Sequence, residues 1–320
     1  MLGLLPYEVV NKIFSHLDAR TKLLCGLVCR QWLDELVSSF AVVTDLVLTF
    51  EDDHCCSAYQ LTPRNLDAGT YTLGITLCQC SSHVGRLILE LNYLLGKIGS
   101  FIRHVVMDDY LVSKSNLVSQ DFIECVLGHC SGLKSLNLEN LSLTGRQLSG
   151  VLVSRLASLR QLVKVRFEAC CPTASLLSPI NDHLIRALAL NGQLGHVTVT
   201  HTNGLTDIAV RYLATYCLQL WYADFTGCPN VTAKGVCHLL RSLPCRSVEL
   251  VYLKIGGTGV DGLELSYRLS AGCSAGTSSG REGGFSSPWK FSMVSLDIAP
   301  RACLVQNLLS PSCCCVLIPS

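Results

Sequence analysis

The sequence has little charge of either sign. Asp, Glu, Lys and Arg make up 15% of the 320 residues, and 25 basic side chains nearly balance 24 acidic ones. Proteins that bind nucleic acid usually carry a basic surface, so this balance argues against a nucleic-acid partner. The abundance of Leu, Val and Ile excludes a wholly disordered chain, because disordered chains bury too little apolar surface to offset their conformational entropy.

Long uninterrupted hydrophobic runs are also missing. Residues 302–320 carry no charge, but Pro311 and Pro319 interrupt the helix that a membrane span would need. The first residues lack the basic stretch of a secretory signal, and Pro6 and Glu8 fall where its apolar region would lie. We therefore expect an intracellular protein, cytoplasmic or nuclear, with no membrane partner.

Catalytic motifs are absent too. The chain has no phosphate-binding GxxxxGK[ST], no GxSxG and no HExxH, and its nine His residues are scattered. Its 19 cysteines lack a secretory signal and a disulfide spacing, which favours reduced thiols packed in the core. Cys25 and Cys29 could hold half of a metal site, but no second ligand pair has zinc-finger spacing. We expect no catalysis, cofactor or metal; a Cys-rich metal or redox protein is an alternative.

The first forty residues have the pattern of three short helices. Pro6 suits a helix start, Glu8 suits a first turn, and Asp18 or Thr21 can cap the next helix. Apolar residues follow at helical spacing: Val9, Val10, Ile13, Phe14, Leu17, Leu23, Leu24, Leu27, Val28, Trp32 and Leu36. Helices this short cannot cover so many apolar positions among themselves, so we expect one face to dock on a partner.

These residues resemble the F-box motif throughout its length, from Leu5-Pro6 through Ile13-Phe14 to Val28-Cys-Arg-x-Trp32. The resemblance implies a three-helix module over residues 1–40 that docks on the Skp-type adaptor of cullin–RING ubiquitin ligases. The positions that match the family's contact pattern are Leu5, Pro6, Ile13, Leu17, Leu23, Val28, Cys29 and Trp32. Periodicity leaves open which of them touch the adaptor and which fill the module's own core. An amphipathic hairpin that caps a repeat domain is the alternative.

Beyond residue 40, short strand-like runs alternate with stretches of helical spacing. The clearest runs begin at Leu133, Leu162, Leu194, Leu220 and Cys245, which are 29, 32, 26 and 25 residues apart, with weaker copies at Val43 and Ile102. This period is close to that of leucine-rich repeats. Residues 51–100 fit the pattern poorly, although 70–77 are strand-like and 84–95 have helical spacing.

The run from 203 to 239 resembles the cysteine-containing subclass of leucine-rich repeats. Cys228 follows a predicted strand, Cys217 ends a predicted helix with its thiol inward, and Thr206 or Thr232 offers a helix cap. The resemblance implies an α/β fold: a short N-terminal three-helix F-box followed by a leucine-rich-repeat solenoid, with parallel strands inside and helices outside. We assign residues 41–255 to this arc, irregular over 51–100, and 256–320 to a flexible Gly/Ser-rich linker and an uncertain tail.

Strand alternation predicts which side chains line the concave face of such an arc. These are Ser135, Asn137, Glu139, Lys164, Arg166, Glu168, His196, Thr198, Thr200, Tyr222, Asp224 and Thr226. The set is mixed in charge and contains an aromatic and an arginine, which are residue types that anchor protein interfaces. We expect a protein substrate to bind there, at Arg166, Glu168, His196, Thr198, Tyr222 and Asp224.

The resemblances together imply a non-catalytic subunit of a Skp–cullin–F-box (SCF) ubiquitin ligase. The F-box would bind the adaptor and, through it, a cullin, while the repeats would bind the target protein. The alternative is a leucine-rich-repeat scaffold whose F-box serves a purpose outside ubiquitination.

Overall fold

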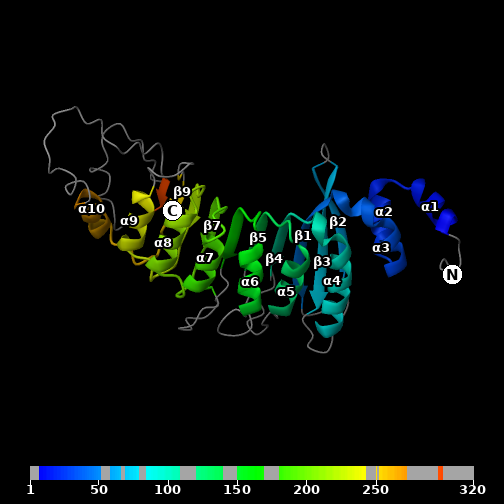
Figure 1. Cartoon of the computed structure of the whole chain (residues 1–320), viewed down its shortest axis with the longest axis horizontal. Coiled ribbons are helices and arrows are strands. Elements are labelled where there is room, and N and C mark those ends of the chain that lie inside the picture. Colours follow the sequence, from blue (N-terminus) through cyan, green and yellow to red (C-terminus); the bar gives the residue numbers. More distant parts are fainter. Residues whose placement is uncertain are drawn as a thin grey trace. The chain divides into compact units, whose positions relative to one another are not determined.

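The computed structural model describes residues 7–51, 58–65, 69–78, 84–108, 120–139, 150–168, 180–242, 250, 252–271 and 295–297. The chain forms two compact units, residues 1–137 and 138–320. The fold is mixed α/β, with helices at the N-terminus followed by strands that are mostly parallel and alternate with helices (Figure 1).

The first unit begins with the three helices expected from the sequence. These are α1 (Tyr7–Ser15), α2 (Ala19–Gly26) and α3 (Arg30–Leu36), followed by a 3-10 turn, η2 (Val37–Val42). The predicted cap of α2 is confirmed, because the Asp18 carboxylate accepts hydrogen bonds from the Thr21 amide at 3.0 Å and hydroxyl at 2.6 Å. The Thr21 hydrogen bonds stabilise the carboxylate and lower the pKa of Asp18.

A sheet follows in the same unit, with strands in the order β4-β1-β3-β2. Strand β1 (Val43–Glu51) pairs in parallel with β3 (Thr70–Cys78) and β4 (His104–Asp108), whereas β2 (Ala58–Asn65) is antiparallel to β3. Helix α4 (Val84–Ile98) with turn η3 (Gly99–Phe101), and helix α5 (Gln120–His129), complete the unit. The poor fit of residues 51–100 to the repeat pattern is explained by the antiparallel strand β2.

The second unit carries parallel strands in the order β6-β7-β8-β9-β10. They are β6 (Lys164–Glu168), β7 (His196–Val199), β8 (Tyr222–Asp224), β9 (Tyr252–Lys254) and β10 (Ser295–Asp297). The helices are α6 (Gly150–Ser158), α7 (Asp182–Ala189), α8 (Asp207–Tyr216), α9 (Ala233–Arg241) and α10 (Gly262–Ala271). Strand β5 (Ser135–Glu139) crosses the boundary between the units.

Register in the second unit aligns one buried residue in each of β6, β7, β8 and β9. Val165 pairs with Val197, Val197 with Ala223, and Ala223 with Leu253, and each of the four is 0% exposed. The alternate residues of β6 lie on the other face and are half-buried. This alternation is what the sequence predicted for a sheet with one face packed against helices.

The last predicted run, from Cys245 to Leu250, lies almost wholly outside the described residues. Residues 243–249 fall outside the described part of the chain, and the strand that pairs with β8 is β9, which follows the buried Leu250. The strand next to β8 in the sheet is therefore one that the sequence analysis did not predict. Both segments carry apolar residues at the same spacing, and the larger Leu250, Leu253 and Ile255 side chains fill the core.

Helix α10 lies in a segment that we expected to be a flexible linker. The Asp261 carboxylate accepts a hydrogen bond from the Leu263 amide at 2.9 Å, which caps the helix. Leu265 is 0% exposed, so the helix buries an apolar side chain. Helical structure is therefore present up to residue 271, within the range that the sequence analysis assigned to the linker.

Candidate functional site

The three N-terminal helices share a small apolar core. The rings of Phe14 on α1 and Trp32 on α3 meet edge to face, with centroids 5.4 Å apart and planes at 79°. Val10 and Leu36 are each 5% exposed in the same cluster, and Leu17 packs against it. This cluster joins α1 to α3 through side-chain packing.

Two pairs of apolar side chains on the same helices face solvent. On α1, Val9 is 42% exposed and Ile13 is 45% exposed; Leu24 on α2 is 42% exposed, and Val28 after it is 69% exposed. Val9 and Ile13 are four residues apart in α1, so they lie on one face of that helix, whereas Val28 lies in the turn that follows α2. Exposed apolar rows of this kind are typical of surfaces that bind another protein.

The eight predicted adaptor-binding residues separate by exposure. Leu5 and Pro6 lie outside the described residues, whereas Ile13, Val28 and Cys29 are exposed. Leu17 and Trp32 are half-buried against the core cluster, and Leu23 is 0% exposed. Sequence analysis did not place Val9 and Leu24 at the contact, because periodicity alone does not distinguish an exposed apolar position from a buried one.

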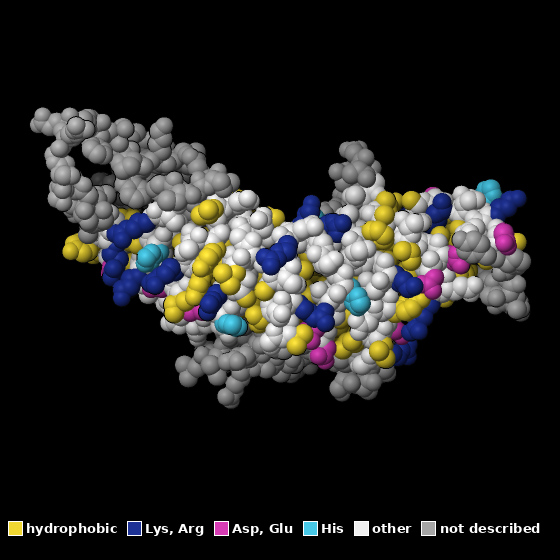
Figure 2. Space-filling model, in the orientation of Figure 1, with side chains coloured by type: hydrophobic (Ala, Val, Ile, Leu, Met, Phe, Trp, Pro, Cys, Tyr) yellow, Lys and Arg dark blue, Asp and Glu magenta, His cyan; other side chains and the backbone are white. Residues whose placement is uncertain are grey.

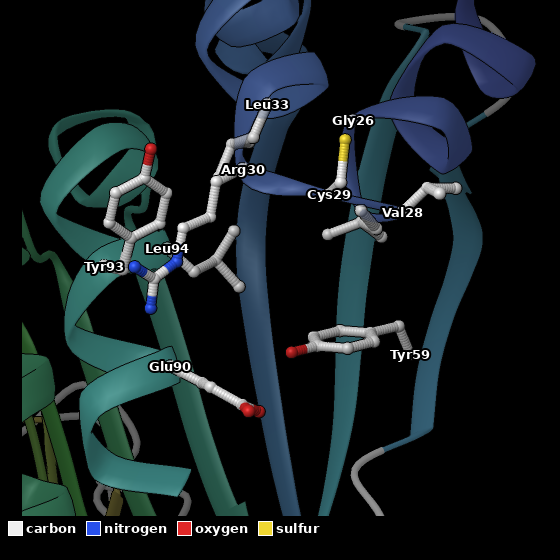
Figure 3. Close-up of a pocket in the computed structure, with 10 residues that line it drawn as sticks. Gly26, Val28, Cys29, Arg30, Leu33, Tyr59, Glu90, Tyr93 and Leu94 are labelled. Atoms are coloured by element: carbon white, nitrogen blue, oxygen red, sulfur yellow. The ribbon is translucent and has the colours of Figure 1, made fainter. Parts of the chain in front are cut away.

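A pocket of about 310 Å³ opens beside the turn between α2 and α3. Its wall contains Val28 and Cys29 from this turn, Arg30 from the start of α3, Tyr59 from β2, and Tyr93 from α4 (Figure 3). Residues far apart in the sequence form it, so no local motif could have predicted it.

Polar contacts fix helix α3 against helix α4 next to this pocket. The Asp34 carboxylate accepts a hydrogen bond from the Tyr93 hydroxyl at 2.9 Å and an ion pair from Lys97 at 2.7 Å. Both groups favour the charged carboxylate and lower the pKa of Asp34, with Lys97 as the larger cause. The Arg30 guanidinium lies over the Tyr93 ring, 4.6 Å from its centroid.

In the second unit, the predicted substrate residues form two rows across the strands. Register aligns His196 with Tyr222 and Tyr222 with Tyr252, and their rings follow one another at 4.1 Å and 5.9 Å between centroids. The His196 and Tyr222 rings stack with planes only 2° apart. Tyr252 extends this aromatic row, and the sequence analysis missed it because it did not predict strand β9.

The second row contains Arg166, Thr198, Asp224 and Lys254. Thr198 is only 4% exposed and Asp224 only 7%, so these two predicted substrate residues offer little surface. Asp224 is held by local hydrogen bonds, because its carboxylate accepts from the amide and hydroxyl of Thr226 at 3.1 Å and 2.7 Å.

Arg166 pairs with acidic groups on both sides. Its Nε lies 3.1 Å from a Glu139 carboxylate oxygen and donates to Glu168 at 2.6 Å. Arg166, Glu168, His196 and Tyr222 each keep part of their surface exposed. These four are the predicted substrate residues that a partner could reach, and Tyr252, which the sequence did not predict, joins them.

His196 is held neutral by its surroundings. Burial, with the positive charges of Lys164 and Arg166, lowers its pKa from 6.5 to about 4, although Asp224 acts in the opposite direction. Because the imidazole is neutral, it stacks on the Tyr222 ring without the free-energy cost of burying a charge. The row therefore presents an aromatic, uncharged centre near neutral pH.

Two predicted structural cysteines are buried. Cys217 and Cys228 are both 0% exposed, and their thiols donate to the carbonyls of Ala189 at 3.7 Å and Val199 at 3.2 Å. The predicted inward direction of both side chains is confirmed. The first hydrogen bond joins the end of α8 to α7, and the second joins the residues after β8 to β7. Both thiols are inaccessible to solvent.

Helix α8 carries a separate apolar strip on the helix-bearing face of this unit. Ile208 is 53% exposed and Tyr216 is 43% exposed, and Figure 2 shows hydrophobic surface over α8 with basic side chains on either side. Arg186 lies over the Tyr212 ring at 5.3 Å. This strip is on the face opposite to the strand residues described above.

Two kinds of feature are absent from the described ranges. No group of three or more His, Cys, Asp or Glu there is arranged to hold a metal ion. Each helix in those ranges is also too short or too polar to cross a lipid bilayer.

Comparison with known proteins identifies one part of the chain. No curated protein sequence matches the chain significantly. Residues 2–39, which contain all three N-terminal helices, match the family described as F-box-like. The chain therefore begins with an F-box-like domain.

Proposed function

We propose that this chain is the substrate-recognition subunit of an SCF ubiquitin ligase. Its F-box-like domain would bind the Skp-type adaptor, which links it to a cullin, and the strand–helix units would bind the target protein. The observation that carries the proposal is the exposed apolar surface of the F-box-like domain, above all Ile13 and Val28, which are 45% and 69% exposed.

Exposed apolar side chains in so small a module favour a permanent partner. Each large apolar side chain left in water forgoes about 1.5–3 kcal/mol of burial free energy, which a partner would recover. In the proposal, Val9, Ile13, Leu24 and Val28 contact the adaptor directly. Leu23 and Trp32 support binding indirectly, because they pack inside the module and hold its helices in position. Leu23 has no exposed surface.

For the remainder of the chain we propose a leucine-rich-repeat solenoid of the cysteine-containing subclass. Parallel strands with one helix per strand support this assignment, as do the buried Cys217 and Cys228. The threonine caps support it further: Thr206 and Thr232 accept hydrogen bonds from Ile208 and Lys234 amides at 3.2 Å and 3.3 Å. Both caps were expected from the sequence.

The proposed substrate site is the strand face of the second unit, centred on His196, Tyr222 and Tyr252. Stacked aromatic side chains bury a large area at low cost in conformational entropy, and Arg166 adds polar contacts at one end. Of the six substrate residues predicted from the sequence, this proposal omits Thr198 and Asp224, because both are too buried to contact a substrate directly.

The proposed role is positional rather than chemical. A receptor that holds a target lysine near a ubiquitin-loaded enzyme raises the effective concentration of that lysine. The chain itself would then need no nucleophile or base. The mixed charge of the strand face suits a protein target better than a nucleic acid, whose phosphates require a basic surface.

Affinity purification from cells tests the assembly. The full chain should recover the Skp-type adaptor and a cullin in stoichiometric amounts, whereas the Ile13→Asp and Val28→Asp double variant should recover neither. Ile208→Asp on α8 is the matched control, because it places the same charge on an exposed apolar site outside the F-box-like domain. Adaptor without cullin would favour a scaffold that acts outside ubiquitination.

A further inference from the structure

The pocket beside the α2–α3 turn combines an apolar floor with a polar rim. Its floor includes Leu33 and Leu94, which are 4% and 5% exposed. Figure 3 places the Tyr59 hydroxyl and the Glu90 carboxylate at its edge, with the Arg30 guanidinium on the same side as Tyr93. An apolar hollow with a polar rim is the form taken by sites that receive one anchoring side chain of a protein partner.

The charges around the rim do not balance. Glu90 pairs with Arg86 at 2.9 Å, and Asp34 pairs with Lys97 at 2.7 Å. Arg30 contacts the face of Tyr93, but among the residues described by the structure no carboxylate forms an ion pair with it. The rim therefore has one positive charge available for an acidic group from outside.

We propose that the adaptor-binding surface continues from the F-box-like domain into this pocket and onto β2 and α4. The adaptor fills the pocket with an apolar side chain and places a neighbouring carboxylate on Arg30. Tyr59 thereby becomes a contact residue, although it lies outside the F-box-like domain. This inference rests on the proposed function.

The adaptor is the occupant because the pocket shares its wall with the proposed adaptor contact. Val28 is 69% exposed and forms part of that wall together with Cys29. A protein that covers Val28 also covers the mouth of the pocket. An apolar group with a nearby carboxylate matches both the floor and the uncompensated Arg30.

This arrangement makes the strand–helix region of the first unit part of adaptor binding. Tyr59, Glu90 and Tyr93 supply one side of the pocket, and contacts from Asp34 to Tyr93 and Lys97 hold α4 against α3. The affinity of the F-box for its adaptor is then set partly by residues beyond position 39.

Calorimetric titration of the purified full chain with the purified Skp-type adaptor tests the inference. Arg30→Glu should weaken binding about tenfold by removing the ion pair and opposing the partner's carboxylate. Tyr59→Ala should weaken it about tenfold by removing one wall of the pocket. Arg211→Glu, an identical charge change at an exposed site of α8 in the second unit, should bind like the wild type.

Hydroxyl-radical footprinting of the wild-type chain gives a second measurement that needs no substitution. Adaptor should protect Tyr59 from oxidation and leave Tyr267, which is 73% exposed on α10, unprotected. If Ile13→Asp abolishes binding while Arg30→Glu and Tyr59→Ala bind normally and Tyr59 stays reactive, the pocket inference is wrong and the proposed function stands. If the wild-type chain has no affinity for the adaptor, both are wrong.

Discussion

The carboxylate of Asp207, at the first position of helix α8, holds both polar groups of Thr232 at the start of the next helix. One oxygen accepts the Thr232 amide at 2.7 Å, and the other accepts its hydroxyl at 2.6 Å. Asp182 makes the same pair of contacts with Thr206, at 2.8 Å and 2.6 Å. Each helix start is thus fixed by the helix before it, which links neighbouring strand–helix units.

Removal of this link should destabilise the second unit. Asp207→Ala leaves the Thr232 amide without its acceptor, and we expect a loss of about 1–3 kcal/mol in the free energy of unfolding. Urea denaturation followed by circular dichroism measures it. Lys234→Ala, at an exposed position in the next turn, is the control and should change little. Equal stability of both variants would contradict the structural role of Asp207.

The neutral state of His196 predicts a pH dependence. Its pKa of about 4 in the folded chain lies below the unfolded value of 6.5, so the unfolded state binds more protons between these values. The contribution of His196 to stability should therefore be complete above pH 6.5 and decline as the pH falls towards 4.

NMR titration of the His196 imidazole measures this directly, and a midpoint near 6.5 would contradict its burial. His196→Gln should reduce the loss of stability over the same pH interval. Because the protonated ring opposes Lys164 and Arg166, acidification should also weaken binding at the aromatic row.

Thiol reactivity should follow burial. Cys130 is 0% exposed, and burial raises its pKa to about 12, with a smaller contribution from Cys125. Iodoacetamide under native conditions should modify the exposed Cys29 and spare Cys130, Cys217 and Cys228 until the chain is unfolded. Peptide mapping by mass spectrometry resolves the sites. Rapid native labelling of Cys228 would contradict its role as a packed core residue.

Substitutions in the F-box-like domain should separate stability from binding. Trp32→Ala removes the edge contact to Phe14 and should lower the free energy of unfolding. Loss of a fully buried aromatic side chain costs about 3–5 kcal/mol, and the loss here should be smaller because Trp32 is half-buried. Val28→Asp, at a site 69% exposed, should leave the thermal unfolding midpoint nearly unchanged while abolishing adaptor binding. If Val28→Asp unfolds the domain, Val28 is a core residue and not a contact.

Much of the architecture could be predicted from local patterns. The Asp18 cap, the threonine caps and the strand alternation at Val165, Val197 and Ala223 depend on residues close in sequence or on a fixed period, which a single chain reveals. Strand β9 was not predicted because Cys245–Leu250 and Leu250–Ile255 have the same apolar spacing, and only pairing with β8 distinguishes them.

The sites required contacts that a sequence does not contain. Burial of Asp224 depends on its hydrogen bonds to Thr226 and on the neighbouring Lys254, whose amine lies 3.9 Å away on the next strand. Similarly, the pocket depends on Tyr59 and Tyr93, which pack beside a turn about thirty and sixty residues earlier. The glycine at position 235 is another example. An added Cβ there would lie 2.5 Å from an Asp207 carboxylate oxygen, and this tertiary contact cannot be predicted from helix propensity.

Direct titration of the purified full chain with a purified Skp-type adaptor tests the central claim. The account predicts a saturable complex for the wild type and its loss for Ile13→Asp, with the circular dichroism spectrum unchanged. Ile208→Asp, at a site 53% exposed on α8, is the matched control and should bind normally. A wild-type chain that is folded yet binds no adaptor, or an Ile13→Asp variant that binds as tightly as the wild type, would contradict it.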